Sequence, residues 1–504
     1  MELEFEREHL HDYETVLDTT LCQEETLEAI VPDACPDIRR IVDCRGQVCL
    51  AGKQAGDGSA EVKGVIRAAV LYQPEGGTAL KKLELSLPFS CRAECAAMTQ
   101  AAEIVAAPRL RRIDARALNP RKVLLRVDLA VDLTVLQPRE RAICTGAGEE
   151  DGLCQLREQC ETYILSAVRE RPFSMTETVR LPAGEGMEIL ACRAAAVCGE
   201  SRLIGSKLIF KGSVNLQLLL QDGAGGITSH QESLPFSQVM EVAGAGEDSV
   251  CDMDVELTDL SWRAAGEDGR SAEISAELLA QAMVWERRPI RLLRDLYSTV
   301  YASRAQTEEL ELTRLVDRSS RTQNMRELLE TAVPAHSAVD CWLSLGQVEQ
   351  QREGDGVNIT AQVLLTAHYL SDEGQPQSVQ RAAQATCRVE CPPEAECRVR
   401  CRWNGEIFTA LAAGGVEARF SLDFFCTVLA RQSIAMTVSG ELGEKCTAQT
   451  GEQPSVVLRL TAPGERLWDI AKAYGTTREE IRLANGLEEE EAPEHTMLLI
   501  PRIR

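Results

Sequence analysis

The sequence has little of what several common protein classes require. Aromatic residues make up only 4% of its 504 residues, and its net charge is −24. Phosphate surfaces attract proteins through a basic footprint, so this charge argues against binding to nucleic acid or to an anionic membrane. No run approaches the roughly 18 uncharged apolar residues that a membrane span needs. We therefore expect no insertion into a membrane.

The start of the chain and its cysteines both indicate a compartment. Residues 1–8 are acidic and lack the apolar run of a signal peptide, so we expect a cytoplasmic protein. The 19 cysteines include no Cys-x-x-Cys pair, which is typical of reduced and mostly buried thiols. A zinc site at Cys387, Cys391, Cys397 and Cys401 is an alternative, but ligands separated by three residues are not the usual zinc spacing.

Motifs for catalysis are also missing. The sequence contains no Gly-x-Ser-x-Gly elbow and no glycine-rich loop ending in Gly-Lys-Ser/Thr. Its six histidines form no metal-binding pattern. We expect a protein that is not an enzyme and that holds no metal and no cofactor.

Several sets of residues recur about 148 residues apart, which predicts three copies of one domain. One set places Cys44, Cys192 and Cys341 each at the end of a short, mainly apolar stretch. A second set repeats Leu-Pro-Phe-Ser at Leu87–Ser90 and at Leu234–Ser237, and the third copy lacks this motif. The third copy is therefore the divergent one.

Each copy has the pattern of a β domain. Val123–Leu133 alternates apolar and polar residues, and Ser271–Met283 and Val416–Leu429 do the same near the ends of the other copies. Such alternation is typical of strands with one buried and one solvated face. Glycine-rich turns separate the strands, with no helical period between them. The sequence predicts a mainly β protein, with three repeated antiparallel β-sandwich or barrel-like domains followed by a small βααβ domain.

The same patterns give approximate domain boundaries. The segments between the β domains are expected to pair with a neighbouring copy as well as to link the copies. We expect an N-terminal arm at 1–29, β domains at 30–145, 165–287 and 320–445, a linker at 446–455 and a terminal module at 456–501.

The terminal module is the most regular stretch of the chain. Its patterns predict a strand at Val456–Leu460, helices at Leu467–Tyr474 and Arg478–Asn485, and a strand at Met497–Ile500. Gly475 and Gly486 would end the two helices. Thr477 begins a capping box for the second helix.

These residues resemble a LysM domain. Eleven positions agree with the LysM pattern in order and spacing: Leu467, Trp468, Ile470, Ala471, Tyr474, Gly475, Asn485, Gly486, Leu487, Ile500 and Pro501. The resemblance implies a shallow groove for N-acetylglucosamine polymers, formed by the first strand–helix loop and the loop before the last strand.

The departures from the LysM pattern fall in that groove. Glu465-Arg466 replaces the usual Asp-Thr, Glu494-His495 replaces the usual Pro-Gly, and Glu488–Glu491 adds an acidic run. Charged side chains where a sugar should approach backbone favour a protein partner instead. The alternative is that these are solvated loop residues beside a working groove. Our candidate partner surface is Gly464, Glu465, Arg466, Leu467, Trp468, Asn485, Gly486, Leu487 and His495.

A second resemblance covers the first copy. Val31–Ile41, with its Pro-Asp-x-x-Pro-Asp-Ile stretch, resembles the opening signature of the SPOCS domain of spore coat-associated proteins, and the two Leu-Pro-Phe-Ser motifs fit the same family. Repeated SPOCS units followed by one LysM domain resemble the SipL-like family of spore coat morphogenetic proteins. This resemblance covers nearly the whole chain.

The family resemblance implies a function. It implies a non-enzymatic scaffold of endospore coat assembly, located in the mother cell at the forespore surface or spore coat. Its LysM domain would dock to SpoIVA, the coat morphogenetic ATPase, and its β domains would contact other coat proteins. The alternative is a peptidoglycan-binding protein of the cell wall or spore cortex.

Overall fold

Strands dominate the protein, as predicted. The computed structural model describes residues 1–182, 186–244, 246, 248–265, 270–446, 456–487 and 495–501. Its described elements are twenty strands and two short helices, so the mainly β fold class is confirmed. Within the described residues, no helix is both long enough and apolar enough to cross a membrane.

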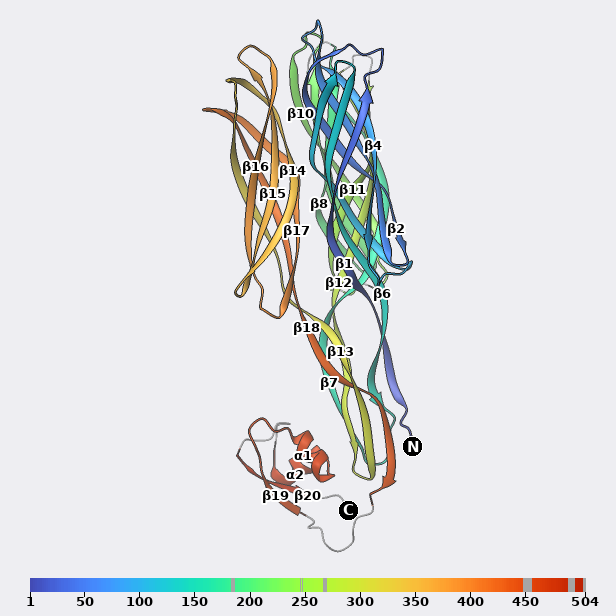
Figure 1. The fold of residues 1–504 in the computed structure, drawn as a ribbon. Coiled ribbons are helices and arrows are strands. Elements are labelled where there is room, and N and C mark those ends of the chain that lie inside the picture. The colour runs from blue at the N-terminus through green and yellow to red at the C-terminus, as the bar shows by residue number, and fades with distance from the viewer. Residues whose placement is uncertain are drawn as a thin grey trace.

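Eighteen of the strands form three units of six, followed by a small terminal module (Figure 1). The first unit contains β1 (Phe5–Ile30), β2 (Ile38–Gly56), β3 (Ser59–Pro74), β4 (Lys81–Glu94), β5 (Glu103–Asn119) and β6 (Lys122–Ala147). The second contains β7 (Leu153–Arg180), β8 (Glu188–Ile204), β9 (Lys207–Gln221), β10 (Ile227–Glu241), β11 (Val250–Ala265) and β12 (Ser271–Ser298). The third contains β13 (Tyr301–Glu330), β14 (Ala335–Glu353), β15 (Gly356–Ser371), β16 (Pro376–Glu390), β17 (Ala395–Ala412) and β18 (Gly415–Lys445).

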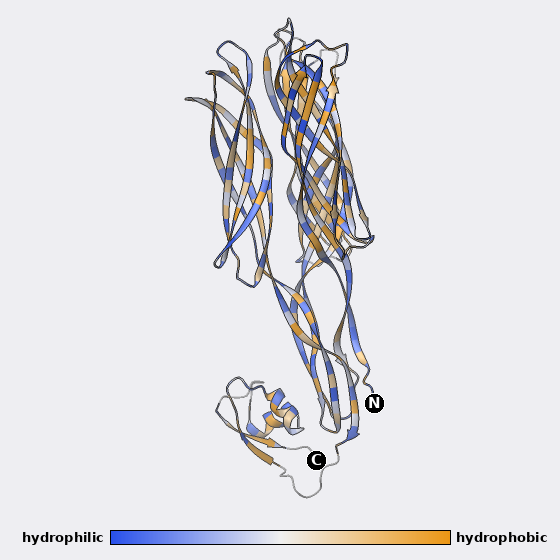
Figure 2. Ribbon diagram, in the orientation of Figure 1, coloured by the Kyte–Doolittle hydropathy of each residue, from blue (hydrophilic) through white to orange (hydrophobic). Residues whose placement is uncertain are grey.

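Every unit is a sandwich of two antiparallel sheets with the same strand order. The second, third and fourth strands of each unit form one sheet, and the first, sixth and fifth form the other. The pairing of Tyr13 with Leu165 joins β1 to β7. The sheet of the first, fifth and sixth strands in unit one is therefore continuous with the equivalent sheet of unit two. Apolar residues at every second position, such as Val123, Leu125 and Val127 in β6, fill the core between the two sheets (Figure 2).

The three sandwiches contact one another in a cyclic pattern. Strand β2 packs on β11, β8 packs on β17, and β14 packs on β5, so each unit offers the same strand to the next unit. Equivalent hydrogen bonds accompany two of these contacts. The Ser229 hydroxyl donates to the Val339 carbonyl at 2.6 Å, and the Ser378 hydroxyl donates to the Val42 carbonyl at 3.1 Å. The units therefore form a closed ring with approximate threefold symmetry within one chain.

The first and last strands of each unit extend beyond the sandwiches into a narrower stem (Figure 1). A separate apolar core fills this stem, with Leu10, Ile164, Leu292 and Leu312 among its buried members. The backbone of Met1–Leu3 also bonds to β18, through Leu3 N–H to the Gly440 carbonyl at 3.0 Å. The three strand pairs therefore share one core along the stem.

The structure differs from the expected boundaries at the first strand of each unit. Residues 1–29 were expected to be an arm, but Phe5–Ile30 is a strand paired with β6 along its length. The segments expected between copies are likewise long strands, and residues 288–322 cover the end of β12, a short turn and most of β13. The physical reason is that these strands are stabilised by pairing with distant residues, which their own polar composition does not reveal.

The terminal module has the order strand, helix, helix, strand. Its elements are β19 (Val456–Leu460), α1 (Leu467–Tyr474), α2 (Arg478–Asn485) and β20 (Met497–Pro501), with β19 and β20 antiparallel. Gly475 ends α1 in the left-handed conformation at φ 64°, which glycine adopts without steric cost. The Thr477 side chain accepts a hydrogen bond from Glu480 N–H at 3.2 Å and begins α2.

Candidate partner-binding module

Helix α1 lies against the stem through Trp468. The Trp468 side chain is 3% exposed, and its indole N–H donates to the Asp295 carboxylate of β12 at 2.8 Å. Its ring packs edge-on against Tyr297 with centroids 4.8 Å apart. Lys472, one helical turn further, donates to the same carboxylate at 2.7 Å. One aspartate therefore holds two residues of α1, and the module has a defined place on the stem.

A hydrogen bond from Tyr297 and an apolar cluster also hold the module against the stem. The Tyr297 hydroxyl donates to the Thr476 carbonyl at 2.7 Å, between the two helices. Cys154 and Leu156 of β7 pack into the same apolar cluster as Leu467 and the rest of the module core. The apolar core of the module is thus continuous with stem residues, which stabilises the docked arrangement.

Two charged residues of the predicted groove are paired inside the module. Glu465 binds Arg459 of β19 and accepts the Ala462 N–H at 3.2 Å, which closes the loop before α1. Arg466 forms a two-pronged pair with Asp469, at 3.0 and 3.2 Å, and its side chain is 62% exposed. The pKa of Arg466 is raised by this pair. Glu465 therefore shapes the loop, whereas Arg466 remains at the surface.

His495 has a left-handed backbone conformation. Its φ is 51°, and the other positive-φ positions among the described residues are glycines. Histidine adopts this region more readily than most other side chains, but it still fills space that glycine leaves open. The side chain is exposed beside Thr496, whose N–H donates to the Thr461 hydroxyl at 3.0 Å. This turn therefore places an imidazole at the surface of the module.

Asn485 joins the end of α2 to the last strand. Its side-chain amide donates to the Leu499 carbonyl at 2.7 Å and accepts from Leu499 N–H at 2.7 Å. Gly486 ends α2 at φ 64°, and Leu487 is partly buried against the module core. These three residues therefore have structural roles.

The structure brings part of the predicted surface together. Gly464, Glu465 and Arg466 lie in the loop that follows Thr461, and the Thr461–Thr496 bonds place His495 next to this loop. Leu467 is fully buried in the module core, and Trp468 faces the stem rather than the groove. The predicted acidic run Glu488–Glu491 and Glu494 lie outside the described residues.

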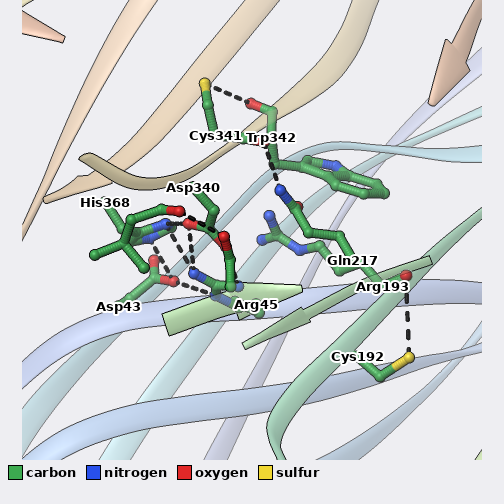
Figure 3. Close-up of polar contacts among 11 residues, drawn as sticks. Asp43, Arg45, Cys192, Arg193, Gln217, Asp340, Cys341, Trp342 and His368 are labelled. Atoms are coloured by element: carbon green, nitrogen blue, oxygen red, sulfur yellow. Dashed lines mark hydrogen bonds and ion pairs between the residues drawn. The ribbon is translucent and has the colours of Figure 1, made fainter. Parts of the chain in front are cut away.

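A second polar cluster lies where the three sandwiches meet (Figure 3). Arg45 of β2 binds Asp340 of β14 through two nitrogens, at 2.7 and 2.9 Å, and its Nε binds Asp43 at 3.0 Å. His368 of β15 lies between the two carboxylates, 2.5 Å from Asp340 and 2.7 Å from Asp43. Arg193 of β8 stacks over Trp342 at 5.0 Å. We call Asp43, Arg45, Arg193, Asp340 and His368 the axial cluster.

Burial and charge together set the protonation states in this cluster. Burial by itself would raise the pKa of Asp43 and of Asp340, but His368 and Arg45 hold both pKa values well below the usual range. Burial would likewise lower the pKa of His368, and the two carboxylates outweigh it and raise that pKa. Burial and the nearby Arg45 lower the pKa of Arg193 to about 10. The cluster is therefore a buried network of charged groups.

Sequence reasoning missed the axial cluster, although the repeats contain a signal for it. Asp43 and Asp340 both directly precede an anchor cysteine, and Arg45 and Arg193 both directly follow one. Charged residues at equivalent positions of apolar strands would have indicated a shared polar contact between copies. The partner His368 could not have been found in this way, because it lies on a different strand of the third unit.

No metal site emerges from the cysteines. Among the residues that the structure describes, no group of three or more His, Cys, Asp or Glu side chains is arranged to hold a metal ion. Cys391 and Cys397 are buried, and Cys387 and Cys401 are partly buried, all as free thiols. Burial raises the pKa of Cys401 to about 12, so this thiol is protonated at neutral pH.

The fold defines a mainly β protein of three antiparallel sandwiches with a small α/β module docked at the end of its stem. A family model described as SipL, SPOCS domain matches residues 37–118 and 187–264. These ranges run from β2 into β5 in the first sandwich and from the start of β8 into β11 in the second. The match indicates similarity to a sporulation-related coat protein. No curated protein matches the chain.

Proposed function

We propose that this protein is a non-enzymatic scaffold of endospore coat assembly that docks through its terminal module to the coat morphogenetic ATPase SpoIVA. The observation that carries the proposal is the SPOCS-domain match in two consecutive sandwiches of a chain that ends in a LysM-like module. The scaffold acts in the mother cell at the forespore surface or in the coat. Its sandwiches contact other coat proteins.

The third sandwich is a divergent SPOCS copy in this proposal. Its strand order repeats that of the other two, and Cys341 occupies the same place in β14 as Cys44 in β2 and Cys192 in β8. The cyclic packing supports the same reading, because β14 and β17 make the contacts that their counterparts make in the other units.

Protein docking suits the module better than glycan binding. Glu465 is used to close the loop, and His495 fills the position where a glycine would let a sugar approach the backbone. Arg466 stays exposed with its donors directed by Asp469, and a carboxylate partner could exchange for that aspartate. The alternative function is binding to N-acetylglucosamine polymers of peptidoglycan. The LysM-like order of strand, helix, helix and strand supports this alternative.

Charge reversal at Arg466 tests the proposal. Arg466→Glu should weaken capture of purified SpoIVA by the full chain about tenfold, the size of effect that loss of one charge-assisted contact gives. The matched control is Arg388→Glu, since Arg388 also forms an exposed ion pair, with Glu353 at 3.3 Å, on the third sandwich. Equal capture by wild type and Arg466→Glu would remove Arg466 from the docking surface.

A further inference from the structure

An apolar face of the terminal module is exposed. Strands β19 and β20 direct five large apolar side chains away from the helices, and Figure 2 shows both strands as largely hydrophobic. Their exposed fractions are 45% for Val456, 66% for Leu458, 58% for Leu460, 57% for Met497 and 37% for Leu499. The register pairs Leu458 with Leu499 and Leu460 with Met497, so these side chains form one continuous ladder. We call these five residues the sheet face.

The rest of the module explains why this face is available. The alternate residues Leu498 and Ile500 point to the helices and are fully buried. On the far side of those helices, Trp468 and Lys472 are held by Asp295 on the stem. The sheet face is therefore directed away from the docking contact. Contiguous apolar side chains exposed on a soluble domain mark a site of interaction.

We propose that the sheet face docks a positively charged amphipathic helix of a partner protein. The proposal rests on the proposed function and adds to the Arg466 loop a second contact between the module and its partner, one that recognises an apolar stripe beside basic residues. The backbone groups of β19 and β20 bond to each other across the ladder, so this face offers side chains rather than free backbone groups. Side-chain packing suits the apolar stripe of a helix, whereas an added strand would bind at a sheet edge.

The size of the face fits one helix and not a second copy of the chain. Five residues of strand span about 17 Å, which is about three turns of helix. Five partly exposed side chains on two short strands offer less surface than the roughly 800 Å² per partner that a stable interface between globular proteins buries. A second copy would also bring a second net charge of −24 to the contact. Both arguments disfavour self-association through this face.

Charge indicates the sign of the partner. The sequence of the module, residues 456–501, carries nine acidic residues against five basic ones, so the module itself favours a basic segment over an acidic one. A helix with apolar residues on one side and lysines or arginines on the other can pack on the apolar side chains of the sheet face and pair with the acidic residues of the module. The attraction must weaken as salt rises, since screening shortens its range.

A designed peptide tests the proposal with the full chain. The probe is a synthetic helix of about four turns, with leucine at positions i, i+3, i+4 and i+7 and lysine elsewhere. The double variant Leu458→Thr/Leu499→Thr makes the centre of the ladder polar with residues that favour strands. Leu483→Gln is the matched control, because Leu483 is 78% exposed on α2 of the same module but lies outside the sheet face.

The expected result is binding of the peptide to wild type and to Leu483→Gln with equal affinity, and at least about tenfold weaker binding to the double variant. A composition-matched scrambled peptide and a version with glutamate in place of lysine should both bind weakly. Equal binding of the basic peptide to the double variant, or equal binding of the scrambled peptide to wild type, would overturn the proposal. So would a dimer of the full chain that the double variant abolishes.

Capture of purified SpoIVA separates the two proposals. Capture by wild type that is lost in Leu458→Thr/Leu499→Thr supports both. Equal capture by wild type and the double variant overturns the sheet face and leaves the proposed function intact. No capture by wild type, combined with ladder-dependent binding of the basic peptide, overturns the choice of SpoIVA as partner and supports the sheet face.

Discussion

At the scale of single residues, His368 lies between two aspartates that come from different sandwiches. Asp43 belongs to the first unit and Asp340 to the third, and all three side chains are buried. A charged imidazole at this point, together with Arg45, balances two carboxylates that would otherwise repel each other in a medium of low polarity. A charged histidine is therefore stable inside this buried junction.

Replacing His368 should reduce stability in a pH-dependent way. His368→Gln removes the cation and should lower the free energy of unfolding by about 3 kcal/mol at pH 6. The pKa of His368 is raised in the folded state, so its contribution is complete below its unfolded pKa and is lost as pH rises through the folded pKa. The difference between wild type and variant should therefore shrink at alkaline pH.

Denaturant unfolding of wild type and His368→Gln at pH 6 and at pH 10 measures the difference in their free energies of unfolding at each pH. His336→Gln is the control, because His336 is exposed at the start of β14 and should leave stability unchanged at both pH values. A loss for His368→Gln that is the same at both pH values would show that packing, and not charge, is what the histidine contributes.

At the scale of elements, α1 is fixed to β12 by one carboxylate. Asp295 accepts from the Trp468 indole and from Lys472, and its removal leaves a buried indole N–H without an acceptor. Asp295→Ala should weaken the docking of the module on the stem by about 2 kcal/mol. The module should then separate from the stem in a larger fraction of molecules.

Small-angle scattering of the full chain measures this separation as an increase in the radius of gyration, together with a red shift of tryptophan fluorescence. Asp18→Ala is the control, since Asp18 is an exposed residue of β1 that accepts a hydrogen bond from Thr134. Unchanged scattering and fluorescence for Asp295→Ala would mean that the apolar contact around Tyr297 holds the module without the carboxylate.

Elements also show what the sequence could predict. The four elements of the module were predictable because their periodicity and caps, such as Thr477 and Gly475, act within a few residues. Strand β1 was not, because Phe5–Ile30 is rich in Glu and Thr and owes its conformation to β6, whose paired residues lie between 92 (Ile30–Lys122) and 142 (Phe5–Ala147) positions away. The stem contact of Trp468 is equally non-local, since Asp295 lies 173 residues earlier.

At the scale of the whole molecule, the chain is a ring of three sandwiches with a stem and one docked module. The cyclic contacts of β2, β8 and β14 bury equivalent surfaces of the three units inside one chain. In a trimer of separate domains, the same surfaces would form the interfaces between subunits. The residues of the axial cluster differ between the units at equivalent positions. Arg45 of the first unit and Arg193 of the second correspond to Trp342 in the third. Such differences give the three units fixed and distinct places in the ring.

A rigid ring and stem would present the module at a fixed end of an elongated body, which suits a scaffold. The most direct test of this account compares capture of purified SpoIVA by the full chain and by a chain that ends at Cys446. The account predicts capture by the full chain and its loss in the shortened chain, with thermal unfolding of the three sandwiches retained in both. Equal capture by the shortened chain, or pelleting of the full chain with peptidoglycan without capture of SpoIVA, would contradict it.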